Sequence, residues 1–498
     1  MDTALCDDLL QEVFRLLPPA AAPAVSLVSR RWYALLRASI ASLTLRLPPP
    51  HHPDASVLLL PPLAALLSRF PFLSALAVLC SSTSATSAPT QIADAMLLAV
   101  ASSASAARLS GLRFLPDSAV SPTALVAASP AFRALASLHL TALRPLSFRW
   151  IASLPRLKSF YLVNSAAASV DSAGLSSDDV DGGGEAVGDL PLERLSLCGI
   201  RSGDRGVGWL WRRCGNLQWL QLRACDGTGD GPSSQLFAGC LVGLLALELR
   251  TCRSVSDRVL LLAADRCRAL RSLLVYDGGS REALHRFIHQ RGAALHTLDL
   301  RLPLDLRNDH LLAIGAEQGQ QLSHNAVHSR SLAALRLQSC VLITGDGLRS
   351  LARTAAGAGI EELALVNCDV VEREPGLLTF LSQSMRRLRR LDLSYNETLS
   401  DKELGAMLSS CHNLIDIRLR GCRCLTRASL VSLLRYCGRS VEVIDITRCL
   451  RIVAADVELF AQEATRLNQM IIDESSVSEE LQAVAHKKSI RIGPLPCD

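Results

Sequence analysis

The sequence predicts an α/β fold, a horseshoe-shaped solenoid of leucine-rich repeats with a parallel sheet on its concave side and helices on its convex side, preceded by a small all-α module. The pattern L-x-x-L-x-L recurs along the chain, and its starts at Ile360, Leu388, Leu414, Val441 and Leu467 are separated by 28, 26, 27 and 26 residues. Such a pattern and period are typical of leucine-rich repeats. A compact pair of apolar helical segments occupies the first forty residues.

The repeat pattern extends over most of the chain. Clear copies begin at Leu192, Leu217, Leu244, Leu295, Leu332, Ile360, Leu388, Leu414 and Val441. Weaker copies begin at Leu135, Leu157, Leu270 and Leu467, and degenerate copies reach back to Leu109 and Leu73. Each copy predicts a short strand whose alternate leucines point inward, followed by a returning helix. Because strands stack about 4.8 Å apart and helices need about 10 Å, an array of such units must curve.

The cysteines follow the same rhythm. The ninth residue of a copy is Cys225, Cys252, Cys340, Cys368, Cys422 or Cys449, with Asn396 at the equivalent place. Cys214, Cys240, Cys267, Cys411 and Cys437 stand just before the next copy, where a returning helix should end. We therefore interpret them as small buried thiols that make weak hydrogen bonds to turn backbone, rather than as disulfides, catalytic groups or metal ligands.

These patterns predict a division into three regions. Residues 1–45 form the helical module, residues 46–134 hold degenerate repeats with a Ser/Ala-rich stretch, and residues 135–492 form the main solenoid. Polar insertions near 164–190 and 315–330 break the rhythm and are expected to be exposed loops.

Composition and charge exclude several classes of protein. Lys and Arg number 52 against 47 Asp and Glu, a net charge of +5, which does not predict nucleic acid or an anionic membrane as partner. The start of the chain carries Asp2, Asp7 and Asp8 without a basic run, so no secretory signal is expected. Prolines interrupt the apolar stretch 55–79, so no membrane span is expected. We expect a cytoplasmic or nuclear protein, or one found in both compartments.

The N-terminal module has the pattern of two packed helices. In LCDDLLQEVFRLLP, Leu9, Leu10, Val13, Phe14 and Leu17 fall on one helical face and Pro18 ends the segment. A second run, SLVSRRWYALLR, brings Val28, Trp32, Leu35 and Leu36 to helical spacing.

These residues resemble the F-box, whose pattern is roughly L-P-D-E-hydrophobic-L, a helix, L-P, and then S-L-V-C-K-R-W. Leu5, Asp7, Asp8, Leu9, Leu10, Val13, Phe14, Leu17, Pro18, Ser26, Leu27, Val28, Arg30, Arg31 and Trp32 occupy its places in register. Cys6 stands where Pro is usual, Ala21 and Ala22 replace Asp-Leu, and Ser29 replaces Cys. The resemblance covers about forty residues, and the repeats that follow make it resemble the plant-like F-box leucine-rich-repeat family.

The resemblance implies a non-catalytic substrate-recognition subunit of a Skp-cullin-F-box ubiquitin ligase. The F-box would bind a Skp-type adaptor, and through it cullin and RING subunits, while the repeats hold a protein substrate. The residues expected at the adaptor are Leu5, Leu9, Leu10, Leu16, Leu17, Pro18, Leu27, Val28 and Trp32. The alternative is a leucine-rich-repeat scaffold whose first forty residues only cap the solenoid, with no link to ubiquitin transfer.

The substrate is expected on the concave sheet face, where residues between the inward leucines point outward. The residues predicted there are Trp219, Gln221, Arg223, Arg250, Tyr276, Arg301, Arg336, Arg390, Arg418 and Arg420. Aromatic residues and Arg are over-represented in interface hot spots, although a solvated sheet would carry similar residues. The resemblance also permits an inositol phosphate on the concave arginines, as in some plant hormone receptors of the family, but no ligand motif supports it.

No motif in the sequence predicts catalysis or a cofactor. His285 and His289 lie four residues apart with Glu282 nearby, a spacing that a metal site can use, but solvated helix residues explain it better. Nucleophile-elbow, P-loop and dinucleotide-binding patterns are missing. We expect no catalytic residue, no metal and no cofactor.

Overall fold

The computed structural model describes residues 5–18, 21–47, 60–80, 90–116, 118–165, 188–204, 206–229, 231–303, 305–315 and 332–493. The chain divides into two compact units, Met1–Leu244 and Leu245–Asp498. Most of the two predicted insertions, residues 166–187 and 316–331, lie outside the described residues.

The first unit begins with three helices, after which strands and helices alternate. Its helices are α1 (Asp7–Leu16), α2 (Ala22–Ser26), α3 (Arg30–Ser39), α5 (Leu60–Ser68), α6 (Thr90–Ala101), α7 (Pro122–Ala128), α8 (Val207–Arg213) and α9 (Gly231–Cys240). Its strands are β1 (Ser42–Leu47), β2 (Ala75–Cys80), β3 (Gly111–Phe114), β4 (Ala119–Val120), β5 (Ser137–Ala142), β6 (Ser159–Asn164), β7 (Arg194–Cys198) and β8 (Trp219–Arg223). Successive strands pair in parallel, and β3 and β4 both pair with β5.

The second unit repeats the same alternation. Its strands are β9 (Ala246–Arg250), β10 (Ser272–Tyr276), β11 (Thr297–Arg301), β12 (Ala334–Gln338), β13 (Glu362–Val366), β14 (Arg390–Asp392), β15 (Asp416–Arg418), β16 (Val443–Asp445), β17 (Gln469–Ile471) and β18 (Arg491–Ile492). Its helices are α10 (Arg253–Arg266), α11 (Arg281–Arg291), α12 (Asn308–Gly315), α13 (Gly345–Ala352), α14 (Ala355–Ala358), α15 (Asp369–Arg373), α16 (Leu377–Ser384), α17 (Asp401–Leu408), α18 (Arg427–Cys437), α19 (Ala454–Glu463) and α20 (Glu479–Lys488). Each of its strands pairs in parallel with the next.

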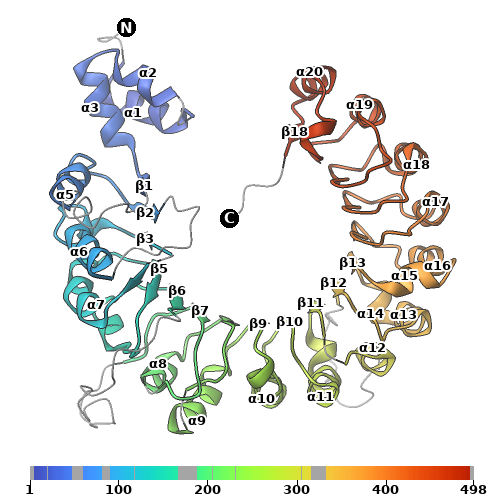
Figure 1. Ribbon diagram of the computed structural model, residues 1–498, viewed down its shortest axis with the longest axis horizontal. Coiled ribbons are helices and arrows are strands. Elements are labelled where there is room, and N and C mark those ends of the chain that lie inside the picture. The colour runs from blue at the N-terminus through green and yellow to red at the C-terminus, as the bar shows by residue number, and fades with distance from the viewer. Residues whose placement is uncertain are drawn as a thin grey trace. The chain divides into compact units, whose positions relative to one another are not determined.

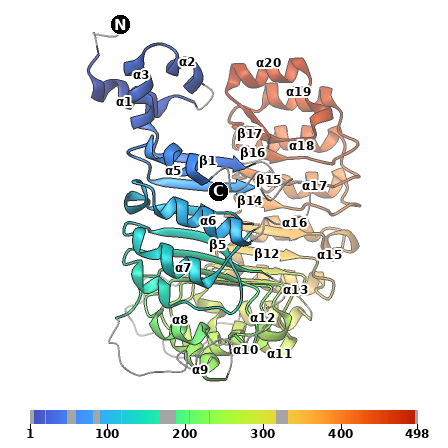
Figure 2. The same ribbon diagram turned by 60° about the vertical axis from the view of Figure 1, so that its left-hand side comes forward.

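In each unit the strands line the inner side and the helices cover the outer side (Figure 1). Within a unit the strands stack in chain order (Figure 2). The inward leucines of neighbouring strands form the layer between sheet and helices, as Leu195 and Leu197 of β7 and Leu220 and Leu222 of β8 show by being at most 1% exposed. The predicted fold class, a helical module followed by a leucine-rich-repeat solenoid, is confirmed.

A left-handed residue follows the strand in many repeats. Thr251, Ser339 and Tyr395 have φ values of 52°, 54° and 62°, and none of them is a glycine. The strain of this conformation is offset by a hydrogen bond, because the N–H of Thr251 donates to the carbonyl of Tyr276 in the next repeat at 2.8 Å. The chain therefore leaves the strand direction at this residue, and one more backbone hydrogen bond still joins it to the next repeat.

The cysteines that recur with the repeats lie at equivalent buried places of successive repeats, and we call this series the cysteine ladder. The thiol of Cys225 donates to the carbonyl of Leu197 in the preceding repeat at 3.5 Å, and Cys422 and Cys449 donate to Leu393 and Leu419 at 3.2 and 3.0 Å. The second set of cysteines is buried near helix ends, where the thiol of Cys437 donates to the Cys411 carbonyl at 3.0 Å. The interpretation of these cysteines as buried structural thiols is confirmed, and none of those described forms a disulfide.

Burial makes six of these thiols unreactive, which alkylation can test. Burial raises the pKa to about 12 for Cys214, Cys267, Cys411, Cys422, Cys437 and Cys449. Because the thiolate is the reactive form, we expect iodoacetamide at pH 8 to modify exposed Cys6 in the native protein and these six thiols only after denaturation. Peptide mass spectrometry would check this. Modification of the six in native protein at the rate of Cys6 would contradict it.

Candidate binding surfaces

The N-terminal helical module, α1 to α3, has its own small core. Leu10, Phe14, Leu35 and Leu36 are buried, and Trp32 packs against them with its ring centroid 5.3 Å from that of Phe14. These positions share one face of α1 and one face of α3, so the two amphipathic helices close on each other. Phe14, Leu35 and Leu36 are therefore core residues of the module rather than part of its surface.

Polar contacts fix how α3 begins. The Ser29 hydroxyl accepts a hydrogen bond from the backbone N–H of Trp32 at 3.1 Å, which caps the helix. Arg31 donates to the Asp7 carboxylate at 2.6 Å and to the Leu5 carbonyl at 2.8 Å. The start of α3 is therefore held against the start of α1, and the segments that carry the predicted adaptor residues are held in a fixed relation.

Several apolar side chains of the module lie outside this core and are exposed. Leu16 and Leu27 are 81% and 86% exposed, and Leu9, Val28 and Leu5 are also exposed. Leucine and valine side chains in water cost free energy, and several of them on one small module indicate a surface that a partner covers. This surface, Leu5, Leu9, Leu16, Leu27 and Val28, is called the apolar face of the module below.

The predicted adaptor residues divide between this face and the core. Pro18 is exposed like the residues of the apolar face. Leu10 is 1% exposed and belongs to the core, and Leu17 and Trp32 are partly buried against it. Spacing on α1 puts Leu9 and Leu10 on one broad face, and only packing against α3 separates them. Val13, 47% exposed, was missed as a surface residue although its spacing from Leu9 and Leu16 signals it.

The predicted concave residues divide between the two units. Trp219, Gln221 and Arg223 belong to β8 of the first unit, whereas Arg250, Tyr276, Arg301, Arg336 and Arg390 belong to strands of the second. Arg418 ends β15 and Arg420 lies just after it.

On the second unit three of the predicted concave arginines are paired with a carboxylate on their own strand. Arg250 lies 2.8 Å from Glu248, Arg301 lies 2.7 Å from Asp299, and Arg418 lies 3.0 Å from Asp416. In each pair the two residues stand two apart on one strand, so they project from the same face. The hydrogen bond to Asp299 also raises the pKa of Arg301. These arginines are compensated rather than free to hold an inositol phosphate.

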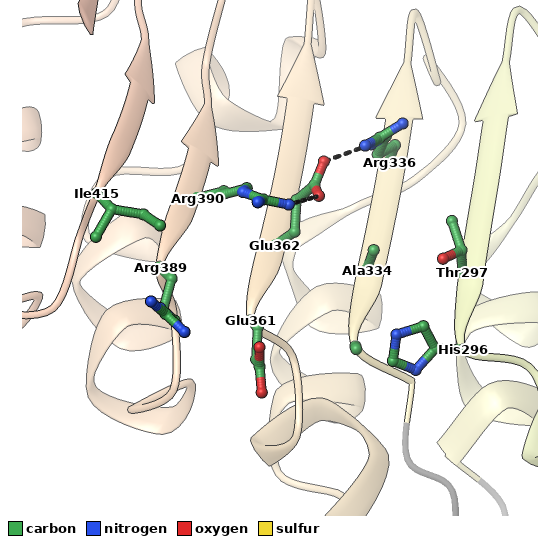
Figure 3. A pocket seen from close by; sticks show the side chains of 10 residues that line it. His296, Thr297, Ala334, Arg336, Glu361, Glu362, Arg389, Arg390 and Ile415 are labelled. Carbon is green, nitrogen blue, oxygen red and sulfur yellow. Dashed lines mark hydrogen bonds and ion pairs between the residues drawn. The ribbon is translucent and has the colours of Figure 1, made fainter. Parts of the chain in front are cut away.

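Pairing also crosses between the strands of the second unit. Arg336 lies 2.5 Å from Glu362, and Arg390 lies 3.6 Å from the other oxygen of that carboxylate (Figure 3). Arg336 also lies 3.6 Å from Asp299, which is nearly buried. These groups border a hollow of about 350 Å³ that His296, Glu361 and Arg389 also line. Its charges of both signs are largely satisfied by one another.

The first unit carries a hollow of a different character. It has a volume of about 260 Å³, and its lining includes Arg113, His139, Tyr161, Ser196, Gln221 and Arg223. The rings of His139 and Tyr161 stack with centroids 3.9 Å apart, and Tyr161 lies 6.1 Å from Trp219. Burial and the nearby Arg113 guanidinium lower the pKa of His139, so this ring is neutral at pH 7. These residues are called the first-unit hollow below.

Sequence reasoning found only part of this hollow. Gln221 and Arg223 of the lining, and Trp219 beside it, were predicted because β8 matches the repeat pattern closely. His139 and Tyr161 occupy the place equivalent to Gln221 in the weaker copies that begin at Leu135 and Leu157. The same outward-pointing rule applied to those weaker copies would have found them.

The described residues also bear on metal sites and on membrane-spanning helices. That part of the chain holds no group of three or more His, Cys, Asp or Glu side chains arranged to hold a metal ion. The rings of His285 and His289 stack on α11 with centroids 6.2 Å apart. None of the helices within the described ranges is long and apolar enough to cross a bilayer.

Comparison with known proteins identifies the N-terminal module. A family model described as the F-box domain matches residues 3–40. Among solved structures, a yeast complex of Rad7 and Elc1 contains a chain with 15% identity and a TM-score of 0.47, over 90% of this chain and 89% of that one. A complex of TLR13 with the RNA ssRNA13 gives 11% identity and a TM-score of 0.36, over 85% of this chain and 58% of that one. Both likenesses are too distant to carry an argument about function.

Proposed function

We propose that this chain, an F-box protein whose F-box domain at residues 3–40 is followed by leucine-rich repeats, is the substrate-recognition subunit of a Skp-cullin-F-box ubiquitin ligase. The observation that carries the proposal is the apolar face of the module, where Leu16 and Leu27 are more than four-fifths exposed. Several exposed leucine and valine side chains on so small a module indicate a surface that a partner covers. A Skp-type adaptor is the partner that an F-box implies, with cullin and RING subunits bound through it.

The repeats would hold the protein to be modified. We assign substrate contact to the concave faces, with Trp219, Gln221 and Arg223 on the first unit and Arg250, Tyr276, Arg301, Arg336, Arg390, Arg418 and Arg420 on the second. Parallel strands present outward side chains in straight rows, which suits an extended or flat protein surface. We propose that these contacts take place in the cytoplasm, the nucleus or both.

The chain would contribute proximity rather than chemistry. Ubiquitin would reach the substrate from a conjugating enzyme elsewhere in the assembly. Holding a substrate beside that enzyme replaces a bimolecular encounter with an intramolecular one, and it raises the effective concentration of the substrate lysine to the millimolar range. The expectation that the chain has no catalytic group of its own is part of this proposal.

Co-purification with a Skp-type adaptor tests the proposal. The full chain is expected to form a stable complex with a purified adaptor on size-exclusion chromatography, and to draw a cullin and a RING subunit into it when they are added. If the wild-type chain stays separate from the adaptor, the receptor proposal fails. A repeat scaffold whose helical module only caps the solenoid would then be the better account.

A further inference from the structure

The first-unit hollow lies along one straight row of the sheet. Arg113, His139, Tyr161, Ser196 and Gln221 are aligned neighbours on five successive paired strands. Each lies between inward-pointing leucine or phenylalanine positions, so the row faces away from the core. Arg223 and Trp219 flank this row on β8, on either side of Gln221. The row therefore offers a continuous track across the strands rather than an isolated pocket.

The charge of this track is not compensated. Arg113 and Arg223 are exposed, no carboxylate lines the hollow, and neither guanidinium has an ion-pair partner within the described parts of the chain. On the second unit, by contrast, Arg250, Arg301 and Arg418 each contact an acidic residue. A pair of unpartnered guanidinium groups attracts carboxylates, with which Arg forms strong bidentate hydrogen bonds.

Between the two arginines the row carries two rings, His139 and Tyr161, and two polar side chains, Ser196 and Gln221. His139 and Tyr161 form a stacked pair, and the ring of Trp219 is covered by the Arg194 guanidinium at 4.9 Å. Because stacking and the cation hold these rings, little side-chain entropy remains to be lost when a ligand contacts them. Neutral His139 adds no charge, so the middle of the track suits an apolar or aromatic side chain and its two ends suit carboxylates.

We propose that the first-unit hollow binds an acidic linear segment of the protein substrate, in which Asp or Glu residues flank an aromatic or aliphatic side chain. This inference rests on the proposed receptor function and specifies which substrates it would take. The volume of about 260 Å³ accommodates one or two side chains, which fits a short segment. A nucleic acid is less suited, because two free arginines would neutralise few phosphates.

Selection from a library of randomised 12-residue peptides, displayed against the full chain, tests the proposal. The enriched peptides are expected to carry Asp or Glu on both sides of an aromatic or aliphatic residue, and their binding should weaken as salt is raised. A selection that enriches basic or uncharged peptides, or enriches none, would overturn the proposal. So would a single-stranded oligonucleotide that displaces an enriched peptide and binds more tightly than it does.

Matched variants assign the binding to the hollow. Arg113→Gln with Arg223→Gln is expected to weaken binding of an enriched peptide by about 100-fold in fluorescence anisotropy, because two charge-assisted contacts are lost. Arg133→Gln with Arg156→Gln removes the same charge from two exposed arginines outside the lining and should change binding less than about twofold. Equal losses in the two double variants would overturn the placement.

The two proposals fail independently. Peptide binding needs no adaptor, and the Arg113 and Arg223 substitutions leave α1 to α3 unchanged. If the chain captures a Skp-type adaptor but selects no acidic peptide, only the substrate class is wrong. If it selects acidic peptides but captures no adaptor, the hollow still binds them and the receptor function fails.

Discussion

Replacing Leu16 and Leu27 together by Asp is expected to abolish capture of a Skp-type adaptor while leaving the folded chain as stable as wild type. Both side chains are more than four-fifths exposed, so the substitutions remove no core contacts. In a complex, each leucine would bury apolar surface worth about 1.5–3 kcal/mol, and each new carboxylate would also have to lose its water. The combined loss of at least about 3 kcal/mol weakens binding more than 100-fold. Surface plasmon resonance with a purified adaptor would measure it.

Two control variants separate loss of the surface from loss of the fold. Val126→Asp with Leu312→Asp places the same two carboxylates on exposed apolar positions of α7 and α12, and adaptor affinity should remain within about twofold of wild type. Leu10→Asp puts a carboxylate in the core of the module and should lose the adaptor by unfolding the module, visible as a changed thermal melt. Wild-type affinity in the Leu16 and Leu27 variant would show that the apolar face is not the adaptor surface.

The repeats were predictable because one constraint recurs at every turn of the solenoid. A repeat unit cannot bury its inward leucines alone, so the pattern survives in each copy and its period is visible in the sequence. The same repetition indicated that the cysteines are buried structural thiols. A position that recurs beside a buried carbonyl favours a small side chain that can donate a hydrogen bond to that carbonyl. Cys368 and Asn396 fill equivalent places and both donate to the preceding repeat.

The helical module was less predictable in detail because it has no repetition. Helical spacing shows that Leu9, Leu10 and Val13 share a broad apolar face, but the direction from which α3 approaches decides that Leu10 is buried and Leu9 exposed. The F-box resemblance predicted that the module carries an adaptor-binding surface. Only the packed structure shows which of the predicted residues lie on that surface and which lie in the core.

The pairing of the concave arginines has both a local and a non-local part. Glu248 and Arg250, like Asp299 and Arg301, stand two apart on one strand, so the sequence contained the signal for their ion pairs. The contact between Arg336 and Glu362 joins β12 and β13. It depends on how these two strands are aligned, which cannot be read from the sequence between them. A count of arginines therefore overstates the positive charge of the second unit. It also does not show that Arg113 and Arg223 on the first unit differ from the others by having no ion-pair partner among the described residues.

Asn396→Ala is expected to give the largest loss of stability among single substitutions on the ladder. Asn396 is 1% exposed, and its amide nitrogen donates to the carbonyls of Leu365 and Leu393 at 2.8 and 2.7 Å. Its side-chain oxygen accepts from the N–H of Cys368 at 3.0 Å. Alanine would leave the Leu365 carbonyl and the Cys368 N–H without these partners, and it would leave the Leu393 carbonyl with the Cys422 thiol alone. The free energy of unfolding should therefore fall by about 3 kcal/mol. The midpoint of urea denaturation would show the loss.

Asn396→Cys provides the matched comparison, because other repeats carry cysteine at this place. A thiol can donate to the Leu365 carbonyl as Cys422 does to that of Leu393, but it cannot accept from the Cys368 N–H as the amide oxygen does. The Leu393 carbonyl would keep only the Cys422 thiol as its donor. We expect the Cys variant to lose about half as much stability as the Ala variant, since it restores one hydrogen bond and most of the volume. If the Ala and Cys variants unfold at the same urea concentration as wild type, the hydrogen bonds of Asn396 do not stabilise the ladder. If both lose the same amount, the ladder depends on the amide itself, because a thiol then replaces none of its bonds.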